Sequence, residues 1–229
     1  AQGLRVKYLF ITAAPEIMAY TRFDNEADGF AYVSASHNPI GHNGIKFGSR
    51  NGSVLGGSEA ADLITAFSES VLTATDSSFI KNTVNAIEAE EVARVLVAVQ
   101  SLKQEALQQY ARFSREVISN EQGEKEQNQF FSTLKTKIIE NPVGVVAELN
   151  GSARTLSIDR EFLQAAGIKT TLINAKPGEV THQIVPEGVG LLPCKQALEQ
   201  KYKQDNTFLF GYVPDNDGDR GNIVVIDPS

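Results

Sequence analysis

The first fifty residues alternate short apolar runs with turns that contain glycine or proline, a pattern that predicts strands and one short helix. Residues 4–11 are rich in β-forming and aromatic side chains and are expected to form a buried strand. A proline in the first turn favours a helix over residues 15–20. Strands are predicted at residues 30–33 and 45–47. In the second of these, the alternation turns the two apolar side chains toward the core and Lys46 away from it.

Residues 58–122 contain neither glycine nor proline, and their apolar residues recur at helical spacing. Ser58 is a suitable N-cap, and Glu59 favours the positive end of the helix dipole. The apolar stripes predict helices that pack against a sheet or a partner helix, and we assign them no chemistry. They consist of Leu63, Ile64, Phe67 and Val71, then of Val92, Val95, Leu96, Val99, Leu102, Ala106, Tyr110, Phe113 and Val117.

A polar stretch at residues 119–126 predicts a boundary between a first domain (residues 1–120) and a second domain (residues 121–229). Beyond it the pattern is that of a βαβ unit. The expected elements are strands at residues 143–149, 168–173, 208–213 and 223–226, and helices at residues 156–166, ended by Gly167, and 194–202. The acidic loop after residue 213 is thus expected at the C-terminal end of a strand, where open α/β sheets bind ligands.

This acidic loop carries Asp215, Asp217 and Asp219 at alternate positions. In extended backbone the three carboxylates point the same way and repel one another unless a cation joins them. Oxygen ligands suit Mg²⁺ or Ca²⁺ rather than zinc. A calcium-binding EF-hand is excluded, because its sixth and twelfth positions are Arg220 and Ile226 instead of glycine and glutamate. A solvated acidic turn is the alternative interpretation.

Arg220 favours a phosphate in the same site. An arginine beside a metal site opposes the cation, whereas its planar fork matches phosphate oxygens. The alternative is a surface arginine that balances the aspartates.

A second motif, Ser-Ala-Ser-His-Asn-Pro at residues 34–39, places the Ser36 hydroxyl next to His37. A Ser-His-Asp triad is weakly supported, because sequence neighbours rarely reach the required geometry and no Gly-x-Ser-x-Gly elbow is present. A phosphorylated Ser36 fits better, since its added charge and oxygens could share a cation with the aspartates. His37 and Lys46 could then supply positive charge or move protons. By itself the motif is also typical of a simple Asn-Pro turn.

Composition narrows the classes of function. The net charge is −7 and there is no block of basic residues, which argues against nucleic acid as a partner. No apolar run approaches the roughly 20 residues that span a bilayer, so no membrane partner is expected. The single cysteine, Cys194, cannot form an internal disulfide, which favours a reducing compartment such as the cytoplasm.

Taken together, these motifs resemble those of the α-D-phosphohexomutases, the phosphoglucomutase and phosphomannomutase family. Residues 34–39 look like the family's Thr-Ala-Ser-His-Asn-Pro phosphoserine loop, residues 43–46 like its Asn-Gly-x-Lys segment, and residues 215–220 like its metal loop. Ser34 replaces the usual threonine and keeps the hydroxyl, and Asn216 replaces a frequent glycine. The resemblance covers three motifs in order, at compatible spacing.

The resemblance implies a role for each matched residue. Ser36 would be the phosphoserine and a ligand of Mg²⁺ together with the three aspartates, and Lys46 a general acid or base. His37 and Arg220 would assist in the active site. The implied fold is two mixed-sheet α/β domains of phosphohexomutase type with the site in the cleft between them, the first domain incomplete at its N-terminus. The family's first arginine loop, sugar-selecting loop and phosphate-binding loop have no counterpart, so a fragment is expected.

The function implied is a sugar-phosphate mutase that moves phosphate between C1 and C6 of a hexose phosphate through phosphoserine and a hexose bisphosphate. The sugar and the oligomeric state are not indicated. Two alternatives stay open: the chain alone could bind Mg²⁺ and phosphate without turnover, or it could be a Mg²⁺-dependent phosphatase with an aspartyl nucleophile. The phosphatase leaves the serine loop unexplained.

Overall fold

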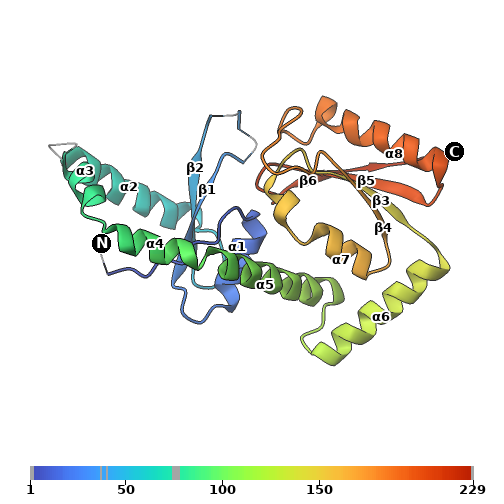
Figure 1. The fold of residues 1–229 in the computed structure, drawn as a ribbon, viewed down its shortest axis with the longest axis horizontal. Coiled ribbons are helices and arrows are strands. Elements are labelled where there is room, and N and C mark those ends of the chain that lie inside the picture. Colours follow the sequence, from blue (N-terminus) through green and yellow to red (C-terminus); the bar gives the residue numbers. More distant parts are fainter. Residues whose placement is uncertain (1–2, 37, 40, 74–77, 228–229) are drawn as a thin grey trace.

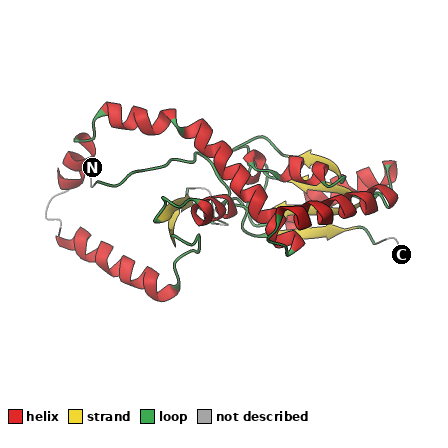
Figure 2. Cartoon of the chain, turned by 90° about the horizontal axis from the view of Figure 1, so that it is seen from below, coloured by secondary structure: helices red, strands yellow, loops and turns green. Residues whose placement is uncertain are grey.

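A computed structural model describes residues 3–36, 38–39, 41–73 and 78–227 (Figure 1). The strands form two groups, a two-stranded sheet and a four-stranded sheet, with helices between and around them (Figure 2). The helices are α1 Ala14–Phe23, α2 Gly57–Thr73, α3 Ser78–Asn85, α4 Ala89–Val97, α5 Val99–Ser119, α6 Glu124–Glu140, α7 Asp159–Ala165 and α8 Leu192–Gln204, with 3₁₀ turns η1 Ala153–Leu156 and η2 Gly188–Leu191. The strands are β1 Gly29–Ser34, β2 Gly44–Ser49, β3 Gly144–Glu148, β4 Lys169–Ile173, β5 Phe208–Pro214 and β6 Gly221–Val225. Within the described residues, no helix has the length and apolar character needed to cross a bilayer.

The part of the chain up to Asn120 is called the first half here. In it, α1 lies between α5 and the β1–β2 hairpin and contacts both. Proline near its N-terminus starts α1 where the sequence predicted it. The small core between these elements contains Leu9, Tyr20 and Ala106. β1 and β2 pair in antiparallel register, with Lys46 opposite Tyr32. The described residues between the two strands, 35–36, 38–39 and 41–43, therefore lie at one end of the hairpin.

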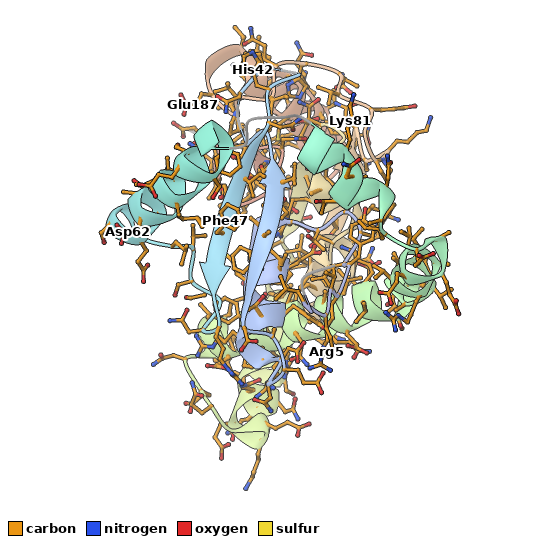
Figure 3. The ribbon with its side chains drawn as sticks, turned by 90° about the vertical axis from the view of Figure 1, so that its left-hand side faces the viewer. Arg5, His42, Phe47, Asp62, Lys81 and Glu187 are labelled. Carbon is orange, nitrogen blue, oxygen red and sulfur yellow. The ribbon has the colours of Figure 1, made fainter. Side chains whose placement is uncertain are left out.

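Two expectations for this half are wrong. Residues 4–11 form no strand, because β1 pairs only with β2 among the described residues, and the backbone before α1 has no strand partner. Ile45 and Phe47 were expected on a core face, but they are 58% and 38% exposed. The side chains along that face of the hairpin, namely Ala31, Val33, Ile45 and Phe47, are all exposed, and Figure 3 labels Phe47 on the hairpin.

The long apolar stripe runs through two helices rather than one. The chain turns at Ala98, between α4 and α5. Val92 and Leu96 on α4 are exposed, whereas Val99 and Ala106 on α5 are buried. Only the part of the stripe that lies against α1 is therefore packed. α5 ends at Ser119, and the next residue, Asn120, adopts a left-handed conformation that stops the helix.

The second half, from Glu121 onward, shows the predicted βαβ pattern, preceded by a helix that was not predicted. That helix, α6, leads to the sheet, whose order is β4–β3–β5–β6. β3 is parallel to both β4 and β5, and β6 is antiparallel to β5. α8 packs against β3 and β5, and α7 against β4, on opposite sides of the sheet (Figure 1). The core comprises Val146, Cys194, Leu198, Phe208 and Val213.

A buried ion pair crosses the first half. The Lys103 ammonium on α5 lies 2.5 Å from the Glu16 carboxylate on α1, whose side chain is fully buried. Burial raises the pKa of Glu16, and the charge of Lys103 opposes that rise without cancelling it. Folding therefore favours the protonated carboxyl, and this group's contribution to stability falls as the pH rises.

The substitution Lys103→Met should lower the free energy of unfolding by about 3–5 kcal/mol, because Glu16 would be left charged and buried. The loss should be smaller at acidic than at neutral pH, since protonated Glu16 needs no partner charge. Urea unfolding at both pH values measures it. The double variant Glu16→Gln/Lys103→Met should recover most of the loss. A single variant as stable as the wild type would contradict this interpretation.

Candidate functional site

Two loops that are far apart in the sequence meet at the C-terminal end of β5 in the four-stranded sheet. The Ser34 hydroxyl, at the end of β1, donates to Asp217 Oδ2 at 2.6 Å across 183 positions of the chain. The Lys46 ammonium on β2 contacts Asp217 Oδ2 at 2.8 Å and Asp219 Oδ2 at 2.7 Å. The hairpin of the first half thus rests directly on the acidic loop that follows β5.

The acidic loop gathers one oxygen from each of Asp215, Asp217 and Asp219 within 4.8 Å of one another. Asp215 and Asp217 are buried, and Asp219 is partly exposed. The loop can turn this tightly because Gly218 has φ +69°, a conformation that favours glycine. Its N–H and that of Arg220 both donate to Asp215 Oδ1, at 3.1 and 3.3 Å.

One oxygen of the trio is suited to a ligand. Asp217 Oδ1 is buried and accepts no hydrogen bond from the described residues. A buried carboxylate oxygen without a donor is costly, and a cation at this position would satisfy it. The donor set is carboxylate oxygen only, which fits Mg²⁺ or Ca²⁺. The three aspartates could therefore hold a hard divalent cation.

The charged groups of the site shift one another's pKa values. Burial raises the pKa of Asp215, and the neighbouring charge of Asp217 adds to the rise. Burial also acts to raise the pKa of Asp217, but hydrogen bonds from Lys46 and Ser34 outweigh it and lower that pKa overall. Burial acts to lower the pKa of Lys46, but its hydrogen bonds to Asp217 and Asp219 outweigh this effect, so the pKa is raised overall. The ammonium thus compensates two of the three carboxylates.

Ser36 lies at the same place, in an uncommon backbone conformation. Its φ is +50°, and its N–H donates to the Ser34 hydroxyl at 2.8 Å. Positive φ in a non-glycine residue carries a local cost and is found at sites where a side chain has to be presented. The sharp turn directs the Ser36 hydroxyl out of the hairpin and toward the acidic loop.

Arg220 joins this hydroxyl to the acidic trio. Its Nη2 donates to Ser36 Oγ at 2.9 Å and to Asp215 Oδ2 at 3.3 Å. Because both oxygens contact the same nitrogen, they can be no farther apart than these two distances together. The guanidinium is half exposed and also lies 3.7 Å from Asp219.

The structure thus brings together most of the residues predicted for the site: Ser36, Lys46, Asp215, Asp217, Asp219 and Arg220. His37 lies outside the described residues. Sequence reasoning did not give Ser34 a role, although its hydroxyl links both loops. The retained hydroxyl at a position where threonine is usual was the available signal.

Backbone groups also hold the acidic loop. Ala14 N–H, at the start of α1, donates to the carbonyl of Asp217 at 2.8 Å. Ala153 N–H, at the start of η1, donates to the carbonyl of Asn216 at 3.0 Å. No side-chain motif encodes these contacts, so the sequence could not reveal them.

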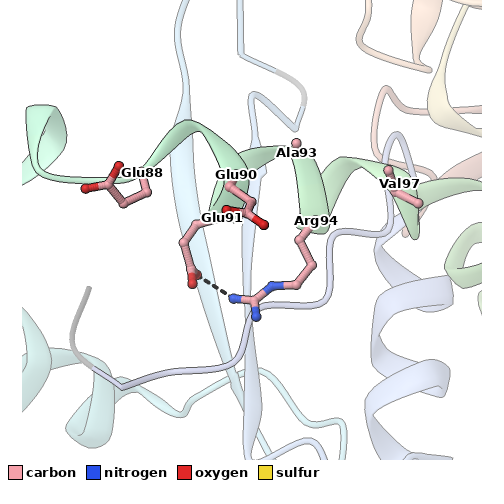
Figure 4. Close-up of a pocket in the computed structure, with 6 residues that line it drawn as sticks. All are labelled: Glu88, Glu90, Glu91, Ala93, Arg94 and Val97. Carbon is pink, nitrogen blue, oxygen red and sulfur yellow. Dashed lines mark hydrogen bonds and ion pairs between the residues drawn. The ribbon is translucent and has the colours of Figure 1, made fainter.

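A hollow of about 540 Å³ lies elsewhere, along α4 (Figure 4). Its lining side chains are all exposed and include Glu91, which forms an ion pair with Arg94. It contains none of the residues described above. We assign it no function.

Comparison with known proteins places the chain in context. Residues 1–73 match the family model for the α/β/α domain I of phosphoglucomutase/phosphomannomutase. No curated protein matches the chain. A crystal structure from Thermus thermophilus, assigned as a phosphomannomutase, is similar over 97% of this chain and 42% of its own, with 21% identity and a TM-score of 0.50.

A phosphoglucomutase/phosphomannomutase family protein from Burkholderia thailandensis is similar over 97% of this chain and 40% of its own, with 17% identity and a TM-score of 0.50. The chain therefore spans about two fifths of the length of both structures. The fold is α/β of phosphohexomutase type, as expected. The family model supports the predicted resemblance to the phosphoglucomutase/phosphomannomutase family over residues 1–73.

Ser34→Ala should weaken Mg²⁺ binding about 10- to 100-fold, because the hydroxyl orients Asp217 and such supporting contacts typically have effects of this size. Ser34→Thr keeps the hydroxyl and should retain affinity. Asp217→Asn, which removes a central anionic ligand, should weaken binding at least as much as Ser34→Ala. Isothermal titration calorimetry measures all three. Unchanged affinity in both Ser34→Ala and Asp217→Asn would exclude the trio as the cation site.

Proposed function

We propose that this chain carries the phosphoserine loop and metal loop of a sugar-phosphate mutase that moves phosphate between C1 and C6 of a hexose phosphate. The single observation that supports it most is the meeting of Ser36 Oγ and Asp215 Oδ2 at Arg220 Nη2. A phosphate on Ser36 would lie against a guanidinium and an oxygen cage, which are the two groups that phosphoryl transfer requires. The family resemblance supports the same reaction class.

The proposed reaction has two balanced transfers. In the first, the bond between phosphorus and Ser36 Oγ breaks and a bond from phosphorus to a substrate hydroxyl forms, which gives a hexose bisphosphate. The hydroxyl proton leaves to a base, and Ser36 Oγ regains a proton. In the second, the other phosphate of the bisphosphate returns to Ser36 by the reverse steps.

Each residue of the site has a role in this proposal. Ser36 carries the phosphate, and Arg220 binds its oxygens. Lys46 provides positive charge and moves the proton, with His37 assisting. Asp215, Asp217 and Asp219, joined by Ser36, would hold Mg²⁺, which supplies charge neutralisation at the transferring phosphate when bound.

The organisation of the chain forms part of the proposal. We place a partial first domain at residues 1–120 and the second domain at residues 121–229, so that the site lies between them. The partners would be a hexose phosphate and a hexose bisphosphate, in the cytoplasm. Because the chain spans about two fifths of the similar structures, turnover is proposed for the longer protein of which this site would be a part.

A second candidate applies to the chain alone, namely binding of Mg²⁺ and phosphate without turnover. This candidate is supported by the length of the chain, which spans about two fifths of the similar structures. If the remaining three fifths also contact the sugar, this chain alone would bind the sugar through fewer contacts. Conversion of glucose 1-phosphate by this chain, in the presence of the bisphosphate, tests this second candidate. Steady turnover by this chain would exclude the binding module.

Incubation with glucose 1,6-bisphosphate and Mg²⁺ should add one phosphate to the chain, and Ser36→Ala should abolish the addition because the acceptor oxygen is lost. Intact mass spectrometry followed by peptide mapping measures it. Ser53→Ala, an exposed serine of the same half, is the control and should be phosphorylated normally. Phosphate that persists in Ser36→Ala and maps to an aspartate would support the phosphatase instead.

Lys46→Ala should slow this phosphorylation about 10²- to 10⁴-fold, the usual size of a general acid–base contribution. The fold should be retained, since the side chain faces the acidic loop rather than the core of either half. Quenched-flow phosphorylation and circular dichroism give the two readouts. Loss of the folded state would assign Lys46 a structural role, and an unchanged rate would remove it from the mechanism.

A further inference from the structure

We propose that Arg154 is a positioning residue for the acidic loop, and that through Tyr110 it makes the metal affinity of this loop depend on contact between the two halves of the chain. The inference rests on the proposed cation site. Arg154 lies in η1, outside every motif that the sequence analysis identified. Its side chain is 16% exposed.

The guanidinium of Arg154 connects elements from both halves. Its Nη1 donates to Tyr110 Oη on α5 at 2.6 Å. Its Nε and Nη2 donate to Asp159 Oδ1 at the start of α7, at 3.2 and 2.8 Å. Tyr212 on β5, three positions before the acidic loop, donates to the same Asp159 oxygen at 2.7 Å. Arg154 therefore contacts α5 and α7 directly, and it is linked through Asp159 to the strand that carries the loop.

The aliphatic part of Arg154 packs against the acidic loop itself. A Cβ placed on Gly218 would lie 2.5 Å from Arg154 Cδ and 2.7 Å from its Cγ. Gly218 lies between the ligand candidates Asp217 and Asp219. The loop thus bends over the Arg154 side chain, and the residue before it, Ala153, holds the Asn216 carbonyl. Movement of Arg154 would displace the backbone between the carboxylates.

The Arg154 side chain keeps its positive charge although it is largely buried. Burial acts to lower its pKa, but the charge of Asp159 and the contact with Tyr110 outweigh it and raise that pKa overall. A planar fork that serves two acceptors cannot be reproduced by lysine. A buried ion pair is weak evidence for stability by itself, whereas it can specify one conformation of the groups around it. In this protein, the specified element would be the loop that binds the cation.

A purely structural role predicts a different result from a positioning role. Loss of either buried pair, Arg154–Asp159 or Lys103–Glu16, should destabilise the chain. Arg154 packs against the acidic loop, whereas the Lys103 ammonium contacts Glu16 on α1. Lys103→Met is therefore a control that destabilises the chain but removes no side-chain contact to the acidic loop.

The test is Mn²⁺ binding by the full chain, followed by electron paramagnetic resonance at a temperature where each variant is folded. Arg154→Met should raise the dissociation constant about 10- to 100-fold, as expected for a residue that orients metal ligands. Arg154→Lys should restore it only in part. Tyr110→Phe, which removes only the contact from the first half, should also raise it. Lys103→Met should leave it within about twofold of the wild-type value, inside the scatter expected for an uncoupled site.

The outcomes separate this inference from the proposed function. Mn²⁺ binding by the wild type with an unchanged constant in Arg154→Met would overturn the inference and leave the cation site intact. No binding by the wild type would overturn the cation site and the inference together. If Arg154→Met does not fold, Tyr110→Phe decides, and an unchanged constant in that variant would overturn the coupling to the first half.

Discussion

Three carboxylates held within 4.8 Å of one another repel, and the rest of this structure depends on how that repulsion is balanced. Lys46 approaches the trio from one half of the chain and Arg220 from the loop itself. The backbone N–H groups of Ala14 and Ala153 donate to the backbone carbonyls of Asp217 and Asn216. These contacts come from both halves, so the acidic loop is also where the two halves are joined.

Three carboxylates can be held close together only on a rigid support, and the end of β5 provides one. A loop at the C-terminal end of a strand flanked by β3 and β6 has a rigid start, and Asp215 and Asp217 are buried there. The hairpin is different, since one of its faces is exposed and its principal support is α1. Ser36 therefore comes from the less supported hairpin and lies against the better supported acidic loop. Contacts such as Ser34 with Asp217 bring the two into register.

Much of this arrangement could be predicted from the sequence. The strands and helices beyond residue 143 follow clear periodicities, and the three motifs contain the hydroxyl, the lysine, the arginine and the carboxylates that meet in space. The helix α6 was missed because the polar stretch at residues 119–126 was interpreted as a boundary, although Phe131, Leu134 and Ile138 recur at helical spacing and are all partly buried. Residues 4–11 have the composition of a strand, but a strand also needs a partner, and composition does not supply one. The contact of Arg154 with Gly218 depends on packing between distant segments, which no local pattern encodes.

The central claim is that one cation can be shared by the aspartate trio and the oxygen of Ser36. The most direct test is phosphorus-31 NMR of the chain phosphorylated on Ser36, titrated with Mn²⁺. A shared site predicts severe paramagnetic broadening of the phosphoserine resonance at stoichiometric metal, reversed by excess Mg²⁺. A phosphoserine resonance that stays sharp while Mn²⁺ is bound to the aspartates would contradict the account.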